Sequence, residues 1–381
     1  MRFIVGFVCF ALAAPMLPAA EPSKFRSLDT SFRHEIQRSI EKGNDFLRSK
    51  QDSNGWWSTP DHPSVTSLVL SALQGEPNTR LKNWPGLAKG YVFVLSCAKP
   101  DGGIYVTELA NYNTSICMMG LLASHDPKYD AVLRKAREFV AGQQTDLGER
   151  SKMDSPWDGG IGYSHDAGRS DMNNTLTALE ALYYTKHLAT DKATEGKDLN
   201  WAAAIEFLQT CQNLPGVNKQ GWVSSDAKDR GGFVYDPVSS KAGSATNASG
   251  NVALRSYGSI SYAGLLSYIY ADVKQSDPRV QAVMDWLRAN YSLQENPGMG
   301  QQGYFYYLHL MTKALNAARL DELRTKDGTN HDWRREVSLR LIDLQKADGS
   351  WQNETGRWWE KDPSLVTAYA VLTLEIIHHE P

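Results

Sequence analysis

The sequence predicts an all-α protein built as an (α/α)6 toroid, a ring of six helical hairpins with glycine-aromatic turns. Two observations predict this fold. A pattern of two apolar residues followed by a glycine-aromatic turn recurs six times along the 381 residues, and such recurrence is the signature of repeat architectures. Each turn is then followed by a second helical stretch that is apolar nearly all round, which indicates a buried helix.

The clearest copy of the repeat has a glutamine between its apolar pair and its turn. It contains Lys42, Gly43, Phe46, Leu47, Gln51, Gly55, Trp56 and Trp57. The later copies end on turns at residues 102–105, 159–163, 231–235, 303–306 and 349–351. The glutamine returns as Gln144, Gln212 and Gln345, whereas the fifth copy has lost it. Much of the unusual content of 11 Trp, 17 Tyr and 30 Gly therefore belongs to the repeat.

The helices of each hairpin differ in pattern. The second helices are expected at residues 66–73, 114–121, 175–182, 258–265, 308–315 and 367–374. The first helices alternate polar and apolar residues at helical spacing, as in residues 134–140, which suits an outer position with one wet face. Six buried inner helices inside six outer helices close naturally into a ring. An open superhelix is the alternative, but the chain ends lack the polar caps that it requires.

The N-terminus reads as a secretory signal peptide at residues 1–20, because Arg2 is followed by an apolar run that ends in Ala19 and Ala20. A transmembrane anchor is the alternative. It fits less well, because Pro15 and Pro18 interrupt a run of 18 residues, and a span needs about 20. We expect a linker at 21–32, a single toroid at 33–381, and an exported protein, periplasmic or extracellular, with no transmembrane segment in the mature chain.

Composition limits the classes of function. Hydrophobic residues make up 41% of the chain and charged residues 22%, with a net charge of −3. A disordered scaffold is excluded by this composition. No basic run stands out, so nucleic acid is not an expected partner. Long Gly/Ser/Asp-rich inserts at residues 147–171 and 215–255 are expected to form loops over one mouth of the ring, where function concentrates.

The repeat resembles the QW repeats of the squalene-hopene and oxidosqualene cyclases and of the related protein prenyltransferase β-subunits. The resemblance rests on the pattern through Gln51 and Trp57 and on its return through Gln345 and Trp351, and it covers residues 33–377. It implies an α/α toroid with a central cavity that accepts an isoprenoid. The resembled cyclases also stabilise carbocations with aromatic faces.

The resemblance also implies where a catalytic acid would lie. Class II cyclases protonate their substrate with the middle aspartate of a D-x-D-D-T segment, and the closest segment here is Asp171, Met172, Asn173, Asn174 and Thr175. Asn173 stands in place of the acid, and an amide carries no acidic proton. We therefore expect no class II cyclase activity. An alternative role for Asp171 is to cap a helix that starts with Asn173 and Asn174.

The prenyltransferase branch of the resemblance implies zinc held by an Asp, a Cys and a His. His309, within residues 306–310, is the candidate histidine, but no D-x-C segment precedes it. Zinc requires three or four ligands in defined geometry. We expect no metal and no cofactor, and we expect His309 to be hydrogen-bonded inside the ring.

Two functions from different classes remain. In the first, an apolar small molecule or lipid binds in the central cavity, because ligand pockets are concave and largely apolar. The expected ligand-binding residues are Tyr112, Met172, Asn173, Asn174, Tyr257, Tyr262, Tyr306 and His309. In the second, the chain is a lyase or hydrolase acting on a carbohydrate or peptide through an acidic loop cluster. That cluster comprises Asp154, Asp158, His165, Asp166 and Asp171, with the last three as the catalytic candidates.

Overall fold

The structure, a computed structural model, describes residues 28–164, 169–189, 198–246, 250 and 252–379. The signal peptide predicted at residues 1–20 lies outside these residues. The helices are α1 (Thr30–Ser49), α2 (Pro63–Gln74), α3 (Pro85–Ser96), α4 (Ala110–Leu122), α5 (Asp130–Ala141), α6 (Met172–Tyr184), α7 (Trp201–Cys211), α8 (Gly258–Tyr270), α9 (Pro278–Ala289), α10 (Tyr304–Ala317), α11 (Trp333–Leu344) and α12 (Pro363–His378), with short 3-10 turns η1 (Pro127–Tyr129), η2 (Lys186–Leu188) and η4 (Arg357–Trp359).

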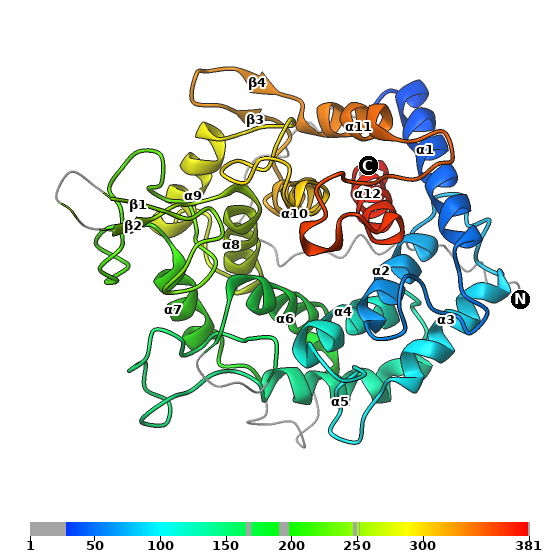
Figure 1. The fold of residues 1–381 in the computed structure, drawn as a ribbon, viewed down its shortest axis with the longest axis horizontal. Helices are drawn as coiled ribbons and strands as arrows, with labels where there is room; N and C mark the ends of the chain where they lie inside the picture. The colour runs from blue at the N-terminus through cyan, green and yellow to red at the C-terminus, as the bar shows by residue number, and fades with distance from the viewer. Residues whose placement is uncertain (1–27, 165–168, 190–197, 247–249, 251, 380–381) are drawn as a thin grey trace, which may run out of the picture.

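The even-numbered helices form a closed inner ring. Helices α2, α4, α6, α8, α10 and α12 contact one another in that order, and α12 returns to contact α2. Figure 1 shows these six helices around the middle of the molecule and the odd-numbered helices outside them. Outer helices α1 and α11, from the first and last hairpins, also contact each other. The predicted (α/α)6 toroid is confirmed, and the open superhelix is excluded by the contact between α12 and α2.

The turn glycines are required by the packing of neighbouring hairpins. Gly231 has φ +97°, and a Cβ added to it would lie 2.1 Å from the carbonyl oxygen of Ala282 on α9. Only glycine combines a left-handed backbone with such an approach. The same contact between a turn glycine and the next outer helix recurs at Gly55, Gly102, Gly159 and Gly349. The recurring glycine therefore marks where one hairpin docks on the next.

The recurring glutamine ties the same two elements together. Gln212 is fully buried, and its Nε2 donates to the carbonyl oxygens of Gly231 at 3.0 Å and of Arg279 at 2.9 Å. One acceptor lies in the turn and the other in the first turn of α9. Equivalent pairs of bonds are made by Gln51, Gln144 and Gln345. Each of these glutamines thus links its own hairpin to the next one through hydrogen bonds.

Some boundaries differ from the sequence prediction. Helix α1 begins at Thr30, within the predicted linker, because the Asp29 side chain accepts a hydrogen bond from the Phe32 N–H at 2.8 Å and caps the helix. The fifth turn, predicted at residues 303–306, is instead the N-cap and first turn of α10. The helix starts early because the buried Glu360 carboxylate accepts a hydrogen bond from the Tyr306 N–H at 2.8 Å. A carboxylate at a helix N-terminus satisfies the unpaired N–H groups there.

The second insert contains regular structure that the sequence did not predict. Strands β1 (Ser244–Thr246) and β2 (Val252–Leu254) pair antiparallel, with Ser244 opposite Leu254. A second small pair, β3 (Leu323–Arg324) and β4 (Asn330–His331), lies between α10 and α11. Both hairpins lie at the periphery in Figure 1, so they do not interrupt the ring.

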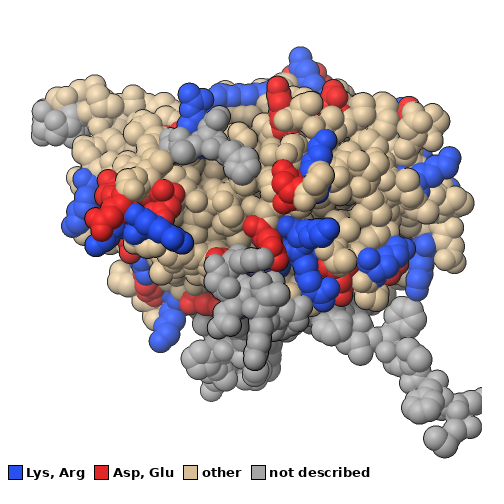
Figure 2. Space-filling view, turned by 90° about the horizontal axis from the view of Figure 1, so that it is seen from below, with Lys and Arg blue, Asp and Glu red and all other residues tan. Residues whose placement is uncertain are grey.

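The face of the molecule seen in Figure 2 carries charges of both signs. On the face shown in Figure 2, lysines and arginines are interspersed with aspartates and glutamates. Such mixing gives no extended positive field of the kind that nucleic acid requires. Among the described residues, no helix combines the length and apolar content needed to cross a bilayer.

Candidate functional site

The candidate site is the lumen, defined here as the space on the ring axis that the inner helices surround. Outer helices cover the outward faces of the inner helices, yet a set of inner-helix side chains keeps partial solvent exposure. They recur at helical spacing: Tyr112, Ile116 and Met119 on α4, Asn173 on α6, Tyr306 and Lys313 on α10, and Leu372 and Ile376 on α12. Residues three, four or seven positions apart share one helix face. These side chains are therefore among those on the inner helices that packing does not bury completely.

Contacts across the ring show that these faces point toward the axis. The Tyr306 hydroxyl on α10 donates to Oδ1 of Asn173 on α6, although α8 lies between these two helices in the ring. The side chains of Tyr112 on α4 and Tyr369 on α12 also lie near enough to influence each other's pKa, although α2 separates their helices. The Tyr306 and Tyr369 rings lie 5.6 Å apart. The sequence-predicted residues Tyr112, Asn173 and Tyr306 thus meet at one level of the lumen.

His309 lies about one helical turn after Tyr306 on α10, and its imidazole is neutral. Its ring lies 5.6 Å from the Tyr369 ring, and its Nδ1 is 3.2 Å from Oγ1 of Thr373. The single hydroxyl hydrogen of Thr373 is donated to the Tyr369 carbonyl at 2.6 Å, so Nδ1 of His309 carries the proton and donates. Burial, and then the nearby charge of Lys313, lower the pKa of His309 well below its usual value. His309 therefore contributes an uncharged imidazole to the lumen.

Asp171 caps α6. Its Oδ1 accepts the N–H groups of Asn173 and Asn174, both at 2.9 Å, and its Oδ2 accepts the Asn174 Nδ2 at 2.7 Å. The residue is 3% exposed. Burial raises the pKa of Asp171 to about 6, although the hydrogen bonds from Asn174 and Asn173 act in the opposite direction. The capping role proposed as the alternative for Asp171 matches this geometry.

Tyrosines surround the Asp171 carboxyl on the side of the inserts. The Tyr235 side chain lies near Asp171 and acts to lower its pKa, and the Tyr235 hydroxyl donates at 3.3 Å to that of Tyr163, which is exposed. Burial, and then the negative charge of Asp171, raise the pKa of Tyr235 and of the N-cap residue Tyr257. This polar cluster links Asp171 to the molecular surface.

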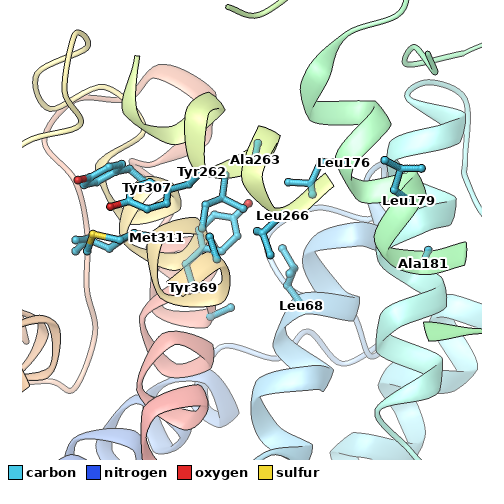
Figure 3. Packing of buried hydrophobic residues seen from close by; sticks show 14 of the residues in the cluster. Leu68, Leu176, Leu179, Ala181, Tyr262, Ala263, Leu266, Tyr307, Met311 and Tyr369 are labelled. Carbon is cyan, nitrogen blue, oxygen red and sulfur yellow. The ribbon is translucent and has the colours of Figure 1, made fainter. Parts of the chain in front are cut away.

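Four other predicted ligand-binding residues lie in the packed wall of the ring. Met172, Asn174, Tyr257 and Tyr262 are each no more than 2% exposed. Tyr262 and Tyr307 pack against each other between α8 and α10 (Figure 3), and their ring centroids are 5.8 Å apart. These side chains shape the wall, and the structure does not bring them to the lumen surface.

The described members of the acidic loop cluster accept hydrogen bonds from nearby backbone N–H groups. Asp154 accepts the Glu149 N–H at 2.9 Å. Asp158 is buried and accepts the N–H groups of Leu147 at 2.7 Å and Ser155 at 2.8 Å. The catalytic candidates His165 and Asp166 lie outside the described residues. The described part of the cluster therefore stabilises the insert that carries it.

The residues present do not fit the zinc site of a prenyltransferase. Across the part of the chain that the structure describes, no three His, Cys, Asp or Glu side chains converge in a way that could hold a metal ion. The Cys117 sulfur contacts the Ser67 hydroxyl at 3.2 Å, and burial raises the pKa of the thiol. A thiol of this kind is inert as a metal ligand.

Sequence reasoning missed three lumen residues: Tyr369, Glu180 and Lys313. The Lys313 Nζ donates to Oε1 of Glu180 across the ring. A signal was present, because Lys313 is the sole Lys, Arg, Asp or Glu in α10 and Glu180 is the sole one in α6. A lone charge in an otherwise uncharged, buried helix requires a partner or a function.

Comparisons with known proteins place the fold. No protein-family model and no curated protein sequence matches this chain. Solved structures are similar to it, and three of them are described below. The type II terpene cyclase MstE from Scytonema matches with a TM-score of 0.53 at 13% identity, over 90% of this chain and 98% of the cyclase. The protein geranylgeranyltransferase-I of Candida albicans, complexed with GGPP, matches at 0.52 and 13%, over 90% and 92%.

The third is a possible member of the GH105 family from Salmonella enterica, with a TM-score of 0.50 at 11% identity, over 95% of this chain and 99% of that one. One structure of a variant of the Scytonema cyclase holds geranylgeranyl dihydroxybenzoate as substrate. The chain therefore has the α/α toroid fold of terpenoid cyclases and protein prenyltransferases over about nine tenths of its length. At these identities the comparisons establish fold and leave the reaction open.

Proposed function

We propose that this protein binds an apolar, isoprenoid-like small molecule in its lumen and does not cyclise it by alkene protonation. One observation carries the proposal: the partly exposed face of the inner ring combines aromatic and apolar side chains with few polar groups. Tyr112, Tyr306 and Tyr369 meet there, and Ile116 and Met119 continue the same face of α4. Ligand sites have this composition.

The acid chemistry of a class II cyclase is not supported by the residues at the start of α6. Asn173 occupies the position of the acid, and its Oδ1 accepts a hydrogen bond from the Tyr306 hydroxyl. Asp171 is occupied by three hydrogen bonds from its own helix. A carboxyl with a pKa of about 6 is also far too weak to protonate an unactivated alkene.

The similar solved structures give independent support for the ligand class. The matched transferase is complexed with GGPP, and the matched cyclase variant holds a geranylgeranyl compound. Export, predicted from residues 1–20, stays a prediction, as does the single toroid at residues 33–381.

The experiment is titration of the purified protein with farnesol, a neutral 15-carbon isoprenoid, by isothermal calorimetry. We expect one saturable site. Ile116→Trp should weaken binding at least ten-fold, because the larger side chain fills the lumen. Val92→Trp is the matched control on an outer helix, where the side chain is 67% exposed, and it should bind as the wild type does. An absence of saturable farnesol binding, or equal affinity in both tryptophan variants, would contradict the proposal.

A further inference from the structure

An ion pair crosses the lumen between two helices that otherwise carry no Lys, Arg, Asp or Glu. Lys313 on α10 donates through Nζ to Oε1 of Glu180 on α6, and α8 lies between these helices in the ring. The two side chains are 17% and 10% exposed, respectively. A sheltered ion pair loses its hydration, and well-packed apolar residues in its place are often as stable or more stable. Stability alone therefore does not explain a charged pair in this position.

The Lys313 side chain is a primary amine held beside a carboxylate and close to aromatic rings. The Tyr270 hydroxyl donates to Oε1 of Glu180 at 3.4 Å. The Tyr270 ring in turn contacts the rings of Tyr183 and Tyr184, with centroids 5.2 and 5.7 Å away. Tyr183, Tyr184 and Lys313 all keep partial exposure. A lysine amine in low-dielectric surroundings with a base beside it is a nucleophile toward carbonyl compounds.

The charge of the pair limits what an apolar ligand can do beside it. An uncharged chain inserted between Lys313 and Glu180 would leave each charge without its partner, which is strongly unfavourable away from water. Condensation of the amine with an aldehyde instead yields a protonated imine. This iminium carries the same single positive charge as the ammonium that it replaces. Glu180 then stays paired, and an apolar chain is attached without an uncompensated charge.

We infer that Lys313 captures an apolar aldehyde of isoprenoid type as a protonated Schiff base, with Glu180 as proton carrier and counter-ion. This inference rests on the proposed isoprenoid binding. It adds the functional group of the ligand and a covalent step that the proposed function does not contain.

The step balances with water as its by-product. The Glu180 carboxylate accepts a proton from the Lys313 ammonium, and the nitrogen lone pair forms a bond to the aldehyde carbon. The π electrons of the carbonyl move to its oxygen, which receives a second proton from the nitrogen. Glu180 then gives its proton to the resulting hydroxyl, the C–O bond breaks as water departs, and the nitrogen lone pair forms the C=N bond. The pair ends as iminium and carboxylate, and no oxidant or reductant is required.

The test uses farnesal, the aldehyde that corresponds to farnesol. The wild-type protein is incubated with farnesal, its imines are reduced to stable amines with cyanoborohydride, and peptides are mapped by mass spectrometry. We expect the adduct at Lys313, with a yield at least ten-fold above that at Lys186. Lys186 is the matched control amine, because it also lies beside a carboxylate, that of Asp272 at 3.8 Å, but is 62% exposed. Excess farnesol should reduce the yield at Lys313.

Two variants separate the roles of the pair. Lys313→Arg keeps a positive charge beside Glu180 but removes the nucleophile, so the total adduct on the intact protein should fall at least ten-fold. Glu180→Gln removes the counter-ion but keeps the amine. The conjugated iminium of farnesal absorbs at longer wavelength than the neutral imine. Because the counter-ion favours the charged form, the pH at which this band is lost should be at least one unit lower in Glu180→Gln than in the wild type.

Equal yields at Lys313 and Lys186, or a Lys313 yield that excess farnesol does not reduce, overturn the inference. The same pH dependence of the band in Glu180→Gln and the wild type overturns the role given to Glu180. If Lys313→Arg does not fold, the mapping and competition in the wild type decide. These failures in a protein that binds farnesol saturably leave the proposed function standing, whereas a wild type that binds no farnesol overturns the proposed function itself.

Discussion

Gly231→Ala should lower the free energy of unfolding by at least about 3 kcal/mol. The added Cβ would lie 2.1 Å from the Ala282 carbonyl oxygen on α9, so either the turn or the outer helix must move. The left-handed backbone at φ +97° adds about 1–2 kcal/mol of strain for any residue with a Cβ. The displaced turn would also weaken the bond between the Gly231 carbonyl and Gln212. Urea denaturation measures the change.

Gly216→Ala is the matched control for this prediction. Gly216 has a similar φ of +90°, but nothing lies within 4 Å of an added Cβ. Its cost should therefore be the backbone strain alone, about 1–2 kcal/mol. If the two variants lose the same stability, the docking of the turn on α9 is not what fixes this glycine in the repeat.

Asp171→Asn should change how stability depends on pH. Burial raises the pKa of Asp171 from 3.8 to about 6 in the folded protein, so between these values the folded state holds a proton that the unfolded state has released. The contribution of this carboxyl to stability is greatest below pH 4 and is lost as the pH rises through 6. At 1.36 kcal/mol per pKa unit the loss is about 3 kcal/mol. Residue 171 of the variant cannot titrate. The free energy of unfolding of the variant, relative to that of the wild type, should therefore rise by about this amount between pH 4 and pH 7.

The amide should preserve the cap itself. Its oxygen can accept the N–H groups of Asn173 and Asn174, and the Asn174 amide can rotate, because its Oδ1 has no partner among the described residues. Asp277→Asn is a control of opposite sign, since hydrogen bonds from Arg279 lower the pKa of Asp277, the N-cap of α9. The stability contributed by Asp277 is present at neutral pH and is lost on acidification. The free energy of unfolding of Asp277→Asn should therefore be furthest below that of the wild type at pH 7. Parallel profiles for Asp171→Asn and the wild type would show that the carboxyl titrates normally.

The ring was predictable from sequence because its construction repeats. Gln212 and Gly231 act through contacts that each hairpin makes with the next, so the same residues recur wherever the contact recurs. The start of α10 was mispredicted for the opposite reason. Its cap comes from Glu360 in the following hairpin. A local sequence pattern cannot indicate a cap that is supplied by a residue so far along the chain.

The lumen was predictable only in part. Tyr112, Asn173 and Tyr306 were expected on the lumen, and they meet there. Tyr262 was expected with them but packs into the wall. Inner helices are apolar on every face, so hydrophobic periodicity cannot separate the face toward the axis from the faces toward neighbouring helices.

The Lys313–Glu180 pair illustrates the other limit. Each charge is conspicuous in its own helix, but their partnership depends on the closure of the ring, which brings α6 and α10 within reach across the axis. Sequence separation alone gives no indication of that contact. The composition of a helix can therefore single out a charge that needs a partner before that partner is known.

Photoaffinity labelling with a farnesol analogue that carries a diazirine tests the central claim most directly, because it reports where the ligand lies. After irradiation and peptide mapping, we predict adducts on the lumen faces of α4, α10 and α12, at or next to Ile116, Met119 and Leu372, and protection of these sites by excess farnesol. Adducts confined to exposed side chains such as Trp358 and Trp359, or labelling that excess farnesol does not reduce, would contradict a ligand site inside the ring.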